Sequence, residues 1–594
     1  MSDRKLFGIL LIALAGVAVL LELGRMEVYT ENEGQRLAPP AEMLRSGDFV
    51  IPTLNGEIYL AKPPLLYWTI AGFYTAAGAI TPFLGRLPVA LSAVLLAFLI
   101  YRFAARHGSP RIGQFTALGL LASPYFLERA RWAELDTPLL LTTFLAIALL
   151  YEAWQADSAS RRLAFAVASG AALAAAALLK GPVPYLFVGA ALLARILVES
   201  TRLDQTIKRL MQWTVICIVI EAVRLLLRVP FPFVLAAAVL GWLVLLVRDA
   251  RHAVWPQLRL ALIALVVSVA LVAPWAAAVL SRLDWAFLNT LLHSEVVDRT
   301  HTATEINSGS PFYYLIALPV MLLPLGLLLP FHFSRTLWQE EGLFYRFCVL
   351  LGWLNLATFS LIAGKEYEYV MPAAPFLLIA SATTLARSAE GDTTRERWIV
   401  YWRRFGTGLF SFAAVGLAIW TAIEEFHPLL LVETAVLGAI ALLVLYSTFV
   451  RTRIPESGVR ILMAGVLVVT SALLTRSFHY TGDRTPREIG TLCGDLKREG
   501  FTVESSDIFA SVAFYTAIPI VEDINPESVV AKMNGDTPYF YLTREKFLQA
   551  FKGKDDQVEE LVLSGPFTNK DLVLIGNAAA REAFSKRADS ASPE

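Results

Sequence analysis

The chain has 594 residues, of which 56% are hydrophobic and 17% are charged, and its mean hydropathy is +0.56. Soluble domains carry about 25% charged residues, so the composition excludes one large soluble protein, and the length excludes a disulfide-stapled small domain. The 51 basic and 51 acidic residues cancel, which gives no reason to expect a nucleic acid partner.

The charged residues are unevenly distributed along the chain. Residues 481–594 hold 32 of the 102 charged side chains, although they make up only 114 of the 594 positions. The pattern predicts a membrane domain over 1–480 and a soluble domain over 481–594, and a segment of this length is typical of one small domain.

Apolar runs long enough to cross a bilayer core of about 30 Å recur from the N-terminus onward. The first, residues 6–21, favours an uncleaved span, because the one Ala-x-Ala candidate for signal cleavage lies inside the run. With it the count is 15 spans, or 13 if 182–197 and 210–228 are re-entrant. The others are 84–106, 111–128, 137–155, 163–180, 230–248, 257–280, 312–333, 343–363, 369–386, 405–424, 428–449 and 458–476.

Short loops rich in Arg and Lys alternate with loops that carry few basic residues, and the positive-inside rule places the basic set in the cytoplasm. The outer side then receives the loops 25–83 and 281–311 and the C-terminal tail. Residues 65–80 are apolar but short and predict a helix that lies at the membrane interface.

Two carboxylates stand close together at the start of the first outer loop. Glu31 and Glu33 are two positions apart, just beyond the first span. Such a pair suits a general base or a metal ligand. A solvated acidic loop explains the same spacing, so this pattern alone leaves both interpretations open.

The rest of the first loop carries an ordered set of motifs. These are Glu42-Met-Leu, Ser46-Gly47-Asp48, Asn55-Gly56, Tyr59 and Lys62-Pro63-Pro64 before an aromatic segment. In this order they resemble the first outer loop of GT-C glycosyltransferases of the protein mannosyltransferase and aminoarabinose transferase type. The resemblance continues to about residue 390 through Gly85-Arg86-Leu-Pro88, Arg131-Trp-Ala-Glu134-Leu-Asp136, Leu179-Lys180-Gly181, His293 to Arg299, and Lys365 to Pro372.

The chain departs from that family at one position. The family has an Asp-Glu pair where this chain has Asn32-Glu33. An asparagine cannot accept the proton that a base must take, so Glu33, or Glu31 one step earlier, has to serve if the reaction needs that carboxylate.

The resemblance implies a polytopic α-helical fold with a small C-terminal α/β domain, and an inverting transfer on the outer face of a bacterial cytoplasmic membrane. The donor would be a polyprenyl-phosphate sugar, and the acceptor a lipid A-like glycolipid, a protein or an envelope glycan. The resemblance implies no definite cofactor, and a divalent metal is left open. The reaction needs a carboxylate at the acceptor, cations at the departing phosphate and an apolar groove for the lipid.

The resemblance also suggests roles for individual residues. Glu33 is the expected base, Glu31 its alternative, and Asp136 a second carboxylate. Lys62, Arg131, Lys365 and, less directly, Arg299 are expected at the donor phosphate, whereas Lys180 either snorkels to the interface or reaches that phosphate. The expected substrate-binding set is Arg36, Tyr59, Lys62, Arg131, Lys180, His293, Arg299, Lys365 and Tyr369.

The tail predicts a small α/β domain. Helices are expected over 487–498, 543–551 and 557–563, and strands at 501–503, 511–515, 519–521, 539–542 and 572–575. Its expected role is contact with the acceptor or packing.

Two other functions fit parts of the sequence. A transporter or flippase would place charges in the membrane, as the cluster Glu221, Arg224 and Arg228 does. Asn32 is compatible with an inactive scaffold of the same fold.

Overall fold

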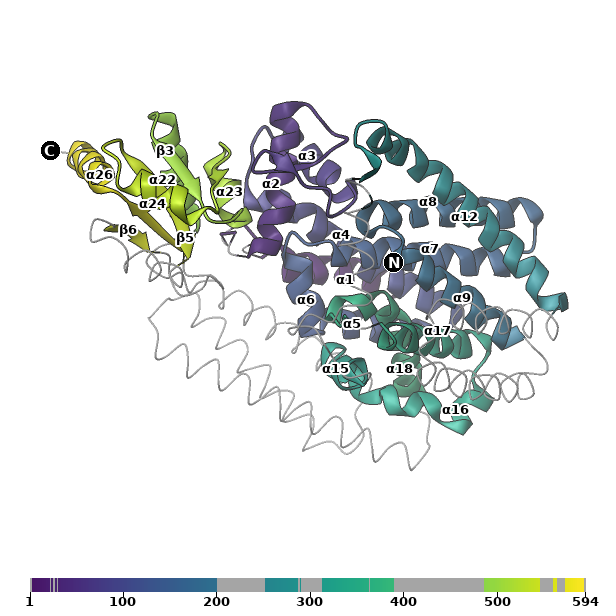
Figure 1. Ribbon diagram of the computed structural model, residues 1–594. Coiled ribbons are helices and arrows are strands. Elements are labelled where there is room, and N and C mark those ends of the chain that lie inside the picture. Colours follow the sequence, from purple (N-terminus) through teal and green to yellow (C-terminus); the bar gives the residue numbers. More distant parts are fainter. Residues whose placement is uncertain are drawn as a thin grey trace, which may run out of the picture.

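A computed structural model describes residues 3–199, 251–289, 312–388, 486–544, 559–563 and 572–591, apart from residues 22, 25, 26, 29, 287, 288 and 363. The described chain forms a large helical bundle and a small mixed sheet with helices (Figure 1). The predicted fold class, a polytopic α-helical membrane protein with a C-terminal α/β part, is confirmed.

The bundle combines long apolar helices with shorter helices that connect or cover them. Those before residue 200 are α1 (Asp3–Leu20), α2 (Glu31–Ser46), α3 (Leu65–Ala77), α4 (Pro82–His107), α5 (Pro110–Leu121), α6 (Pro124–Arg131), α7 (Asp136–Gln155), α8 (Ala159–Lys180) and α9 (Val183–Glu199). The later ones are α12 (Arg251–Leu280), α15 (Tyr313–Met321), α16 (Arg335–Glu340), α17 (Leu343–Ser360) and α18 (Ala374–Ser388), with 3-10 turns η2 (Leu325–Phe333) and η3 (Tyr367–Ala373).

Within the described ranges, six helical segments are long and apolar enough to cross a membrane. They run over 82–107, 136–155, 159–180, 254–280, 343–360 and 367–387. The helix α12 packs along α8, and its other side exposes Leu262, Val266 and Val269. An apolar face of this size is stable in lipid and not in water.

Ser or Thr followed by Pro begins three of these helices. Thr81, Ser109 and Ser123 each accept a hydrogen bond from the backbone N–H three residues on, and a proline follows in each case. This is the favoured start of a helix, because proline lacks only an N–H that the first turn cannot pair.

Two predicted spans are wrong as single helices. The expected span 111–128 is divided at Ser123, where α5 ends and α6 begins. The span 312–333 consists of α15 and the 3-10 turn η2, with Pro324 between them. In both cases a proline inside the apolar run interrupts the helical hydrogen-bond ladder. The predicted spans 210–228, 230–248, 405–424, 428–449 and 458–476 lie outside the described residues.

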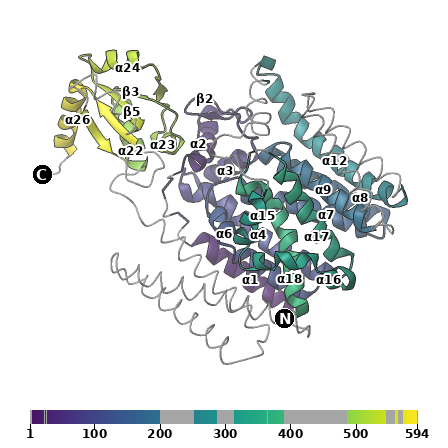
Figure 2. The same ribbon diagram turned by 60° about the horizontal axis from the view of Figure 1, so that its bottom comes forward.

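The first loop forms a compact layer at one end of the bundle. Thr30 caps α2 by accepting a hydrogen bond from the N–H of Glu33 at 3.2 Å. A short hairpin, β1 (Thr53–Leu54) and β2 (Glu57–Ile58), follows α2 and precedes α3, the predicted interfacial helix. Figure 2 shows these elements at the same end of the bundle as the C-terminal sheet.

The C-terminal part is a five-stranded mixed sheet in the order β4-β3-β5-β7-β6. Strand β3 pairs parallel with β4 and β5, and β7 pairs antiparallel with β5 and β6. The strands are β3 (Thr502–Ser505), β4 (Val521–Glu522), β5 (Tyr539–Arg544), β6 (Glu559–Leu563) and β7 (Leu572–Gly576). The helices are α22 (Pro486–Arg498), α23 (Ala510–Thr516), α24 (Pro526–Met533) and α26 (Ala578–Ala591).

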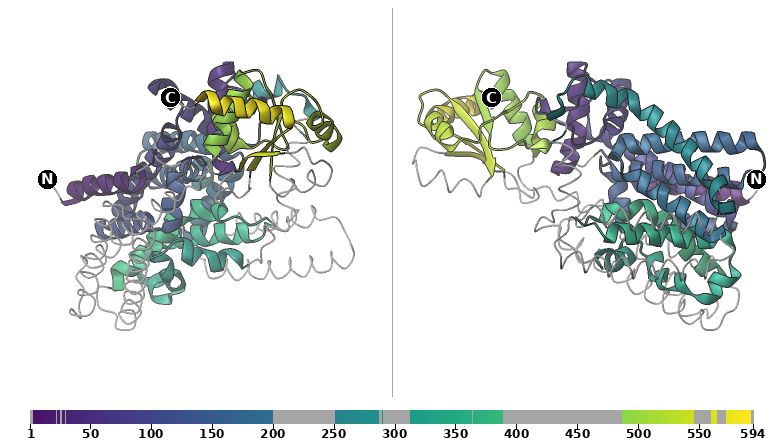
Figure 3. Two further views of the ribbon diagram at one scale, coloured as in Figure 1. Left: turned by 90° about the vertical axis from the view of Figure 1, so that its left-hand side faces the viewer. Right: turned by 45° about the vertical axis from the view of Figure 1, so that its right-hand side comes forward.

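Alternating side chains on β5 face two layers of helix. Phe540 and Leu542 pack with residues of α22 and α26, whereas Tyr539 and Tyr541 pack with α24. The strand is therefore buried on both faces, as expected for the centre of a sheet covered on both sides. Figure 3 shows α26 lying across the strands.

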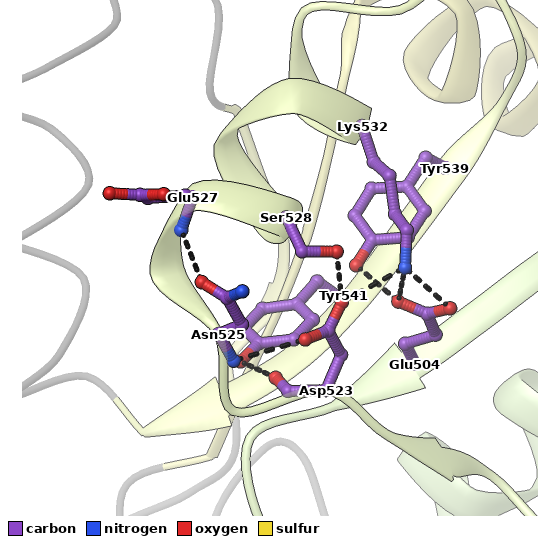
Figure 4. A network of polar contacts seen from close by, with 8 residues as sticks. All are labelled: Glu504, Asp523, Asn525, Glu527, Ser528, Lys532, Tyr539 and Tyr541. Atoms are coloured by element: carbon purple, nitrogen blue, oxygen red, sulfur yellow. Dashed lines mark hydrogen bonds and ion pairs between the residues drawn. The ribbon is translucent and has the colours of Figure 1, made fainter.

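A polar network fastens α24 to the sheet (Figure 4). Lys532 donates hydrogen bonds to Glu504 at 2.7 and 2.9 Å and to Asp523 at 2.9 Å, and the Tyr539 hydroxyl donates to Glu504 at 2.8 Å. Hydrogen bonds from Ser528 and Lys532 lower the pKa of Asp523. All these groups pair with one another, which favours a structural role for the network.

Two tail predictions are wrong. Residues 511–515, expected as a strand, lie in α23, because Ala510 and Phe514 contact the first loop while Val512 contacts the sheet layer. Residues 557–563, expected as a helix, contain the strand β6, which pairs with β7 along the sheet edge. In both places tertiary pairing overrides a weak local pattern. Most of the predicted helix 543–551 lies outside the described residues, and its first two residues end β5.

Candidate functional site

A cavity of about 410 Å³ opens between the segment after the hairpin and the ends of several membrane helices. Two lysines, Lys62 and Lys180, line it together with Glu368 and Tyr369. The apolar part of the wall includes Leu139, Val183, Leu186, Phe187, Phe359 and Ile362. A cavity of this kind can hold an apolar chain and an anionic group at the same time.

Lys180 and Asp136 form an ion pair at the edge of this cavity. The distance from Lys180 Nζ to Asp136 Oδ1 is 3.1 Å, and Asp136 is buried. Lys180 is the last residue of α8 and Asp136 the first of α7, so the pair joins the ends of two antiparallel membrane helices. The Nζ also lies 5.4 Å from the centre of the Tyr369 ring. This contact fixes the ammonium group at the cavity wall.

Arg36 on α2 is buried beneath the hairpin. It donates hydrogen bonds to the hydroxyl groups of Tyr59 at 3.4 Å and Tyr67 at 3.2 Å, and the Tyr59 hydroxyl donates to Gln35 at 2.9 Å. Asp136 lies within electrostatic reach of Arg36. The guanidinium therefore adds a third positive charge next to the two lysines.

Four residues outside the predicted site set complete the cluster: Tyr125, Arg129, Glu134 and Glu368. Arg129 pairs with Glu134, and the Tyr125 hydroxyl donates to Glu368 at 3.5 Å. Burial, together with the nearby Asp136, outweighs Arg129 and raises the pKa of Glu134 to about 7. Glu134 and Glu368 both stand inside motifs that carried the family resemblance, and that was the available signal.

Glu33, the predicted base, has the contacts of a structural ion pair. Its two carboxylate oxygens accept hydrogen bonds from Arg86 at 2.7 and 2.8 Å, and one also accepts from the N–H of Ala133 at 3.0 Å. The side chains of Glu33 and Arg86 are 0% and 1% exposed. Glu33 does not line the cavity described above.

Glu31, the alternative base, contacts the C-terminal domain. One of its carboxylate oxygens accepts a hydrogen bond from the N–H of Ala510 at 2.6 Å, and the other accepts from the Ser511 hydroxyl at 3.0 Å. Asn32, between Glu31 and Glu33, is exposed.

Two residues expected at the donor phosphate instead bind backbone carbonyls. Arg131, fully buried, donates to the carbonyls of Ala18 at 3.0 Å and Leu21 at 2.6 Å. Lys365 donates to carbonyls at the end of α17, among them that of Ser360 at 2.7 Å. These contacts satisfy the unpaired carbonyls that every helix leaves at its C-terminus.

The structure thus brings together Arg36, Tyr59, Lys62, Asp136, Lys180 and Tyr369, and places Glu31, Glu33, Arg131 and Lys365 in other contacts. His293 and Arg299 lie outside the described residues. No group of three or more His, Cys, Asp or Glu side chains suited to a metal ion occurs in the described part of the chain.

Comparison with known proteins shows similarity to the same family as the motifs. Residues 61–226 match the family described as dolichyl-phosphate-mannose-protein mannosyltransferase. The crystal structure of ArnT from Cupriavidus metallidurans bound to undecaprenyl phosphate superimposes with a TM-score of 0.69 over 98% of this chain and 99% of that one, at 20% identity. The chain has the GT-C fold and is similar to the mannosyltransferase and aminoarabinose transferase family.

Curated relatives of this GT-C protein align over different lengths. An undecaprenyl phosphate-α-4-amino-4-deoxy-L-arabinose arabinosyl transferase of Pseudomonas savastanoi is 30% identical over 28% of this chain and 31% of its own. An uncharacterised protein of Aquifex aeolicus is 35% identical over 22% of this chain and 26% of its own. A transferase of the same name from Pectobacterium carotovorum is 26% identical over 70% of this chain and 66% of its own. The chain thus spans about a quarter to a third of the first curated relatives that it matches.

The Glu33–Arg86 pair gives a prediction about the stability of this GT-C protein. Glu33→Ala should lower the free energy of unfolding by about 3–5 kcal/mol, because it leaves the buried Arg86 charge unpaired. The measurement is thermal unfolding of the purified protein in detergent without substrate. The double variant Glu33→Gln/Arg86→Met should recover part of the loss. Equal stability of Glu33→Ala and the wild type would contradict the structural role of the Glu33–Arg86 pair.

Proposed function

We propose that this protein transfers a sugar from a polyprenyl-phosphate-linked donor to an acceptor at the membrane, with inversion at the anomeric carbon. The observation that carries the proposal is the apolar cavity with Lys62 and Lys180 on its wall and carboxylates beside them. The comparison adds support, because the similar ArnT structure is described as bound to undecaprenyl phosphate.

The two lysines suit the phosphate of the donor. Lys62 follows the hairpin and Lys180 ends α8, so they approach the cavity from different parts of the chain. Positive groups placed at a departing phosphate stabilise the charge that develops there. Phe187, Phe359 and Leu186 offer an apolar surface to the first isoprene units of the lipid.

The reaction exchanges one bond for another at the anomeric carbon. An acceptor oxygen forms a bond to this carbon while the bond to the phosphate oxygen breaks, and the polyprenyl phosphate leaves with the electron pair. A hydroxyl acceptor also gives up its proton, which a nearby carboxylate accepts. A phosphate acceptor carries no such proton and needs a carboxylate only for orientation.

Glu368 is the carboxylate that we assign to the acceptor. Of the acidic side chains in the described part of the chain, it is the one that lines this cavity. Asp136 is assigned to the orientation of Lys180, to which it is ion-paired. Glu33 and Glu31 are assigned to structural contacts.

The acceptor and the side of the membrane are finer parts of the same proposal. The matched family is named for a protein acceptor, whereas the name of the arabinosyl transferases gives no acceptor, so a lipid A-like glycolipid, a protein and an envelope glycan are all included. We place the cavity and the C-terminal domain on the periplasmic face of a bacterial inner membrane, because the basic loops lie at the opposite ends of the spans.

Removal of the Lys62 charge should weaken donor binding. Lys62→Gln is expected to reduce the affinity for polyprenyl phosphate by about tenfold or more, because a charge-assisted contact is worth about 1.5–3 kcal/mol. Binding is measured with the purified protein in lipid nanodiscs. Lys586→Gln is the matched control, since Lys586 is an exposed lysine of α26 far along the chain. Equal affinities for the two variants would contradict the assignment of the cavity to the donor.

The two carboxylates should separate in kinetics. With a hydroxyl acceptor, Glu368→Gln is expected to lower kcat by about 10²–10⁴-fold while polyprenyl phosphate still binds. Asp136→Asn should mainly weaken donor binding, because Lys180 loses the partner that orients it. Turnover is followed with a panel of polyprenyl-phosphate sugars. Full activity of both variants would contradict the roles assigned to Glu368 and Asp136.

The sidedness can be tested with one cysteine. Lys586→Cys places a thiol on an exposed helix of the C-terminal domain, and Cys348 and Cys493 are buried. With Cys217 replaced by Ser, a membrane-impermeant maleimide should label this position in intact spheroplasts. Labelling only after lysis would place the domain in the cytoplasm and overturn the orientation.

Failure of the wild type to bind any polyprenyl phosphate would favour the transporter or the inactive scaffold instead. Binding without turnover of any donor and acceptor pair would favour the scaffold, for which Asn32 is the sequence argument.

A further inference from the structure

We propose that the C-terminal domain is a positioning element of the donor site, and that Glu31 and Asn55 are the residues through which it acts. This inference rests on the proposed function, since it concerns how Lys62 is held at the donor phosphate. Glu31 and Asn55 are positioning residues in this proposal, because their contacts are made with the C-terminal domain and not with the cavity.

The first contact joins the start of α2 to the start of α23. Both Glu31 oxygens accept hydrogen bonds from this helix, one from the N–H of Ala510 and one from the hydroxyl of Ser511. A Cβ added to Gly34 would lie 2.3 Å from the carbonyl carbon of Ala510. The two helices therefore touch backbone to backbone, which only a glycine at position 34 permits (Figures 1 and 3).

The second contact joins the hairpin to the segment before β4. The Asn55 side chain donates to the carbonyl of Ile520 at 2.5 Å and accepts from its N–H at 2.6 Å. Asn55 has a φ of +58°, a left-handed conformation that asparagine adopts more readily than most residues. The Asn55 side chain thus pairs with both backbone groups of Ile520, which lies 465 positions further along the chain.

The hairpin is held on its other side by α2. Glu42 accepts hydrogen bonds from the Thr53 hydroxyl at 2.5 Å, the Asn55 N–H at 2.7 Å and the Gly56 N–H at 3.2 Å. The hairpin is therefore fixed between α2 and the C-terminal domain, and a shift of either one would move it.

Lys62 lies only four residues beyond the end of this hairpin. The chain between Ile58 and Lys62 spans at most about 14 Å when extended, and Tyr59 in this stretch is tied to α2 through Arg36 and Gln35. The placement of the hairpin consequently limits where the Lys62 ammonium group can reach in the cavity.

Apolar packing extends the same interface. Phe514 of α23 belongs to the hydrophobic cluster of the first loop, together with Val28, Leu37 and Leu54. The hydroxyl of Tyr515 accepts a hydrogen bond from the N–H of Val28 at 2.8 Å. Because α23 takes part in the cores of both parts of the molecule, the domain is docked rather than tethered.

The test compares five variants of the full-length protein in nanodiscs: Glu31→Gln, Glu31→Ala, Ser511→Ala, the double variant Glu31→Ala/Ser511→Ala, and Asn55→Ala. Hydrogen exchange of residues 53–62 reports the placement of the loop, and the affinity for polyprenyl phosphate reports the donor site. Glu57→Gln is the control, since Glu57 is an exposed carboxylate on the same hairpin.

We expect Ser511→Ala and Asn55→Ala to speed exchange over 53–62 and to weaken polyprenyl phosphate binding by about tenfold. Ser511→Ala should add no further effect to Glu31→Ala in the double variant, because Glu31→Ala already removes the hydrogen bond that Ser511 donates. Glu31→Gln keeps an oxygen for the N–H of Ala510 and should stay within about threefold of the wild type in both readouts and in kcat.

Other results would overturn the inference. A kcat loss of 10²-fold or more in Glu31→Gln, with unchanged exchange and donor affinity, would make Glu31 the base. Unchanged exchange and affinity in Ser511→Ala and Asn55→Ala would contradict the positioning role of the C-terminal domain. The proposed function would not be affected, because it is tested by the activity of the wild type. A wild type that binds no polyprenyl phosphate would overturn the proposed function, and hydrogen exchange alone would then decide whether the interface holds the loop.

Discussion

The buried pair of Arg86 and Glu33 is the interaction on which the architecture of the site depends. Arg86, near the start of α4, also donates to the carbonyls of Leu23 and Glu27 at 3.0 and 2.8 Å, and Glu33 accepts the N–H of Ala133. One charge pair therefore joins the end of α1, the start of α2, the start of α4 and the segment before α7. The Arg86 charge can be buried here only because nearly all its hydrogen-bonding groups find partners. These four segments therefore have little freedom to move apart.

This constraint explains why Glu31 and Glu33, which stand at or beside the position of the family's acidic pair, do not line the cavity. Glu33 is used inside the scaffold and Glu31 at the interface with α23, whereas Glu368 and Asp136, from elements far along the chain, lie at or beside the cavity with Lys62 and Lys180. With asparagine at position 32, the carboxylates at the site come from the ends of membrane segments, Asp136 from the start of α7 and Glu368 from η3. Helix ends suit this purpose, because their positions are set by packing along the whole span.

Much of the fold could be read from the sequence, since long apolar runs and Ser-Pro or Thr-Pro starts mark the membrane helices locally. The cavity residues Lys62, Lys180 and Tyr369 were found because their motifs resemble those of a family. The partners of Glu33 and Glu31 could not be found, because Arg86 is 53 positions from Glu33 and Ser511 is 480 positions from Glu31. A single sequence carries no record of such contacts. The same limit explains the wrong strand prediction for residues 511–515. Only the structure shows that the apolar residues of α23 belong to two hydrophobic cores.

The position of α23 gives the C-terminal domain a physical reason to be attached to this membrane protein. The long loop between α1 and α4, which lies over the cavity, has to be ordered against its own conformational entropy. Membrane helices can hold such a loop only from below, through groups such as Arg86 of α4. The sheet and α23 hold it from the side and above, through the backbone of Ile520 and the start of a helix. The loop between them is thereby fixed on both faces, and Lys62 within it is held at the wall of the cavity.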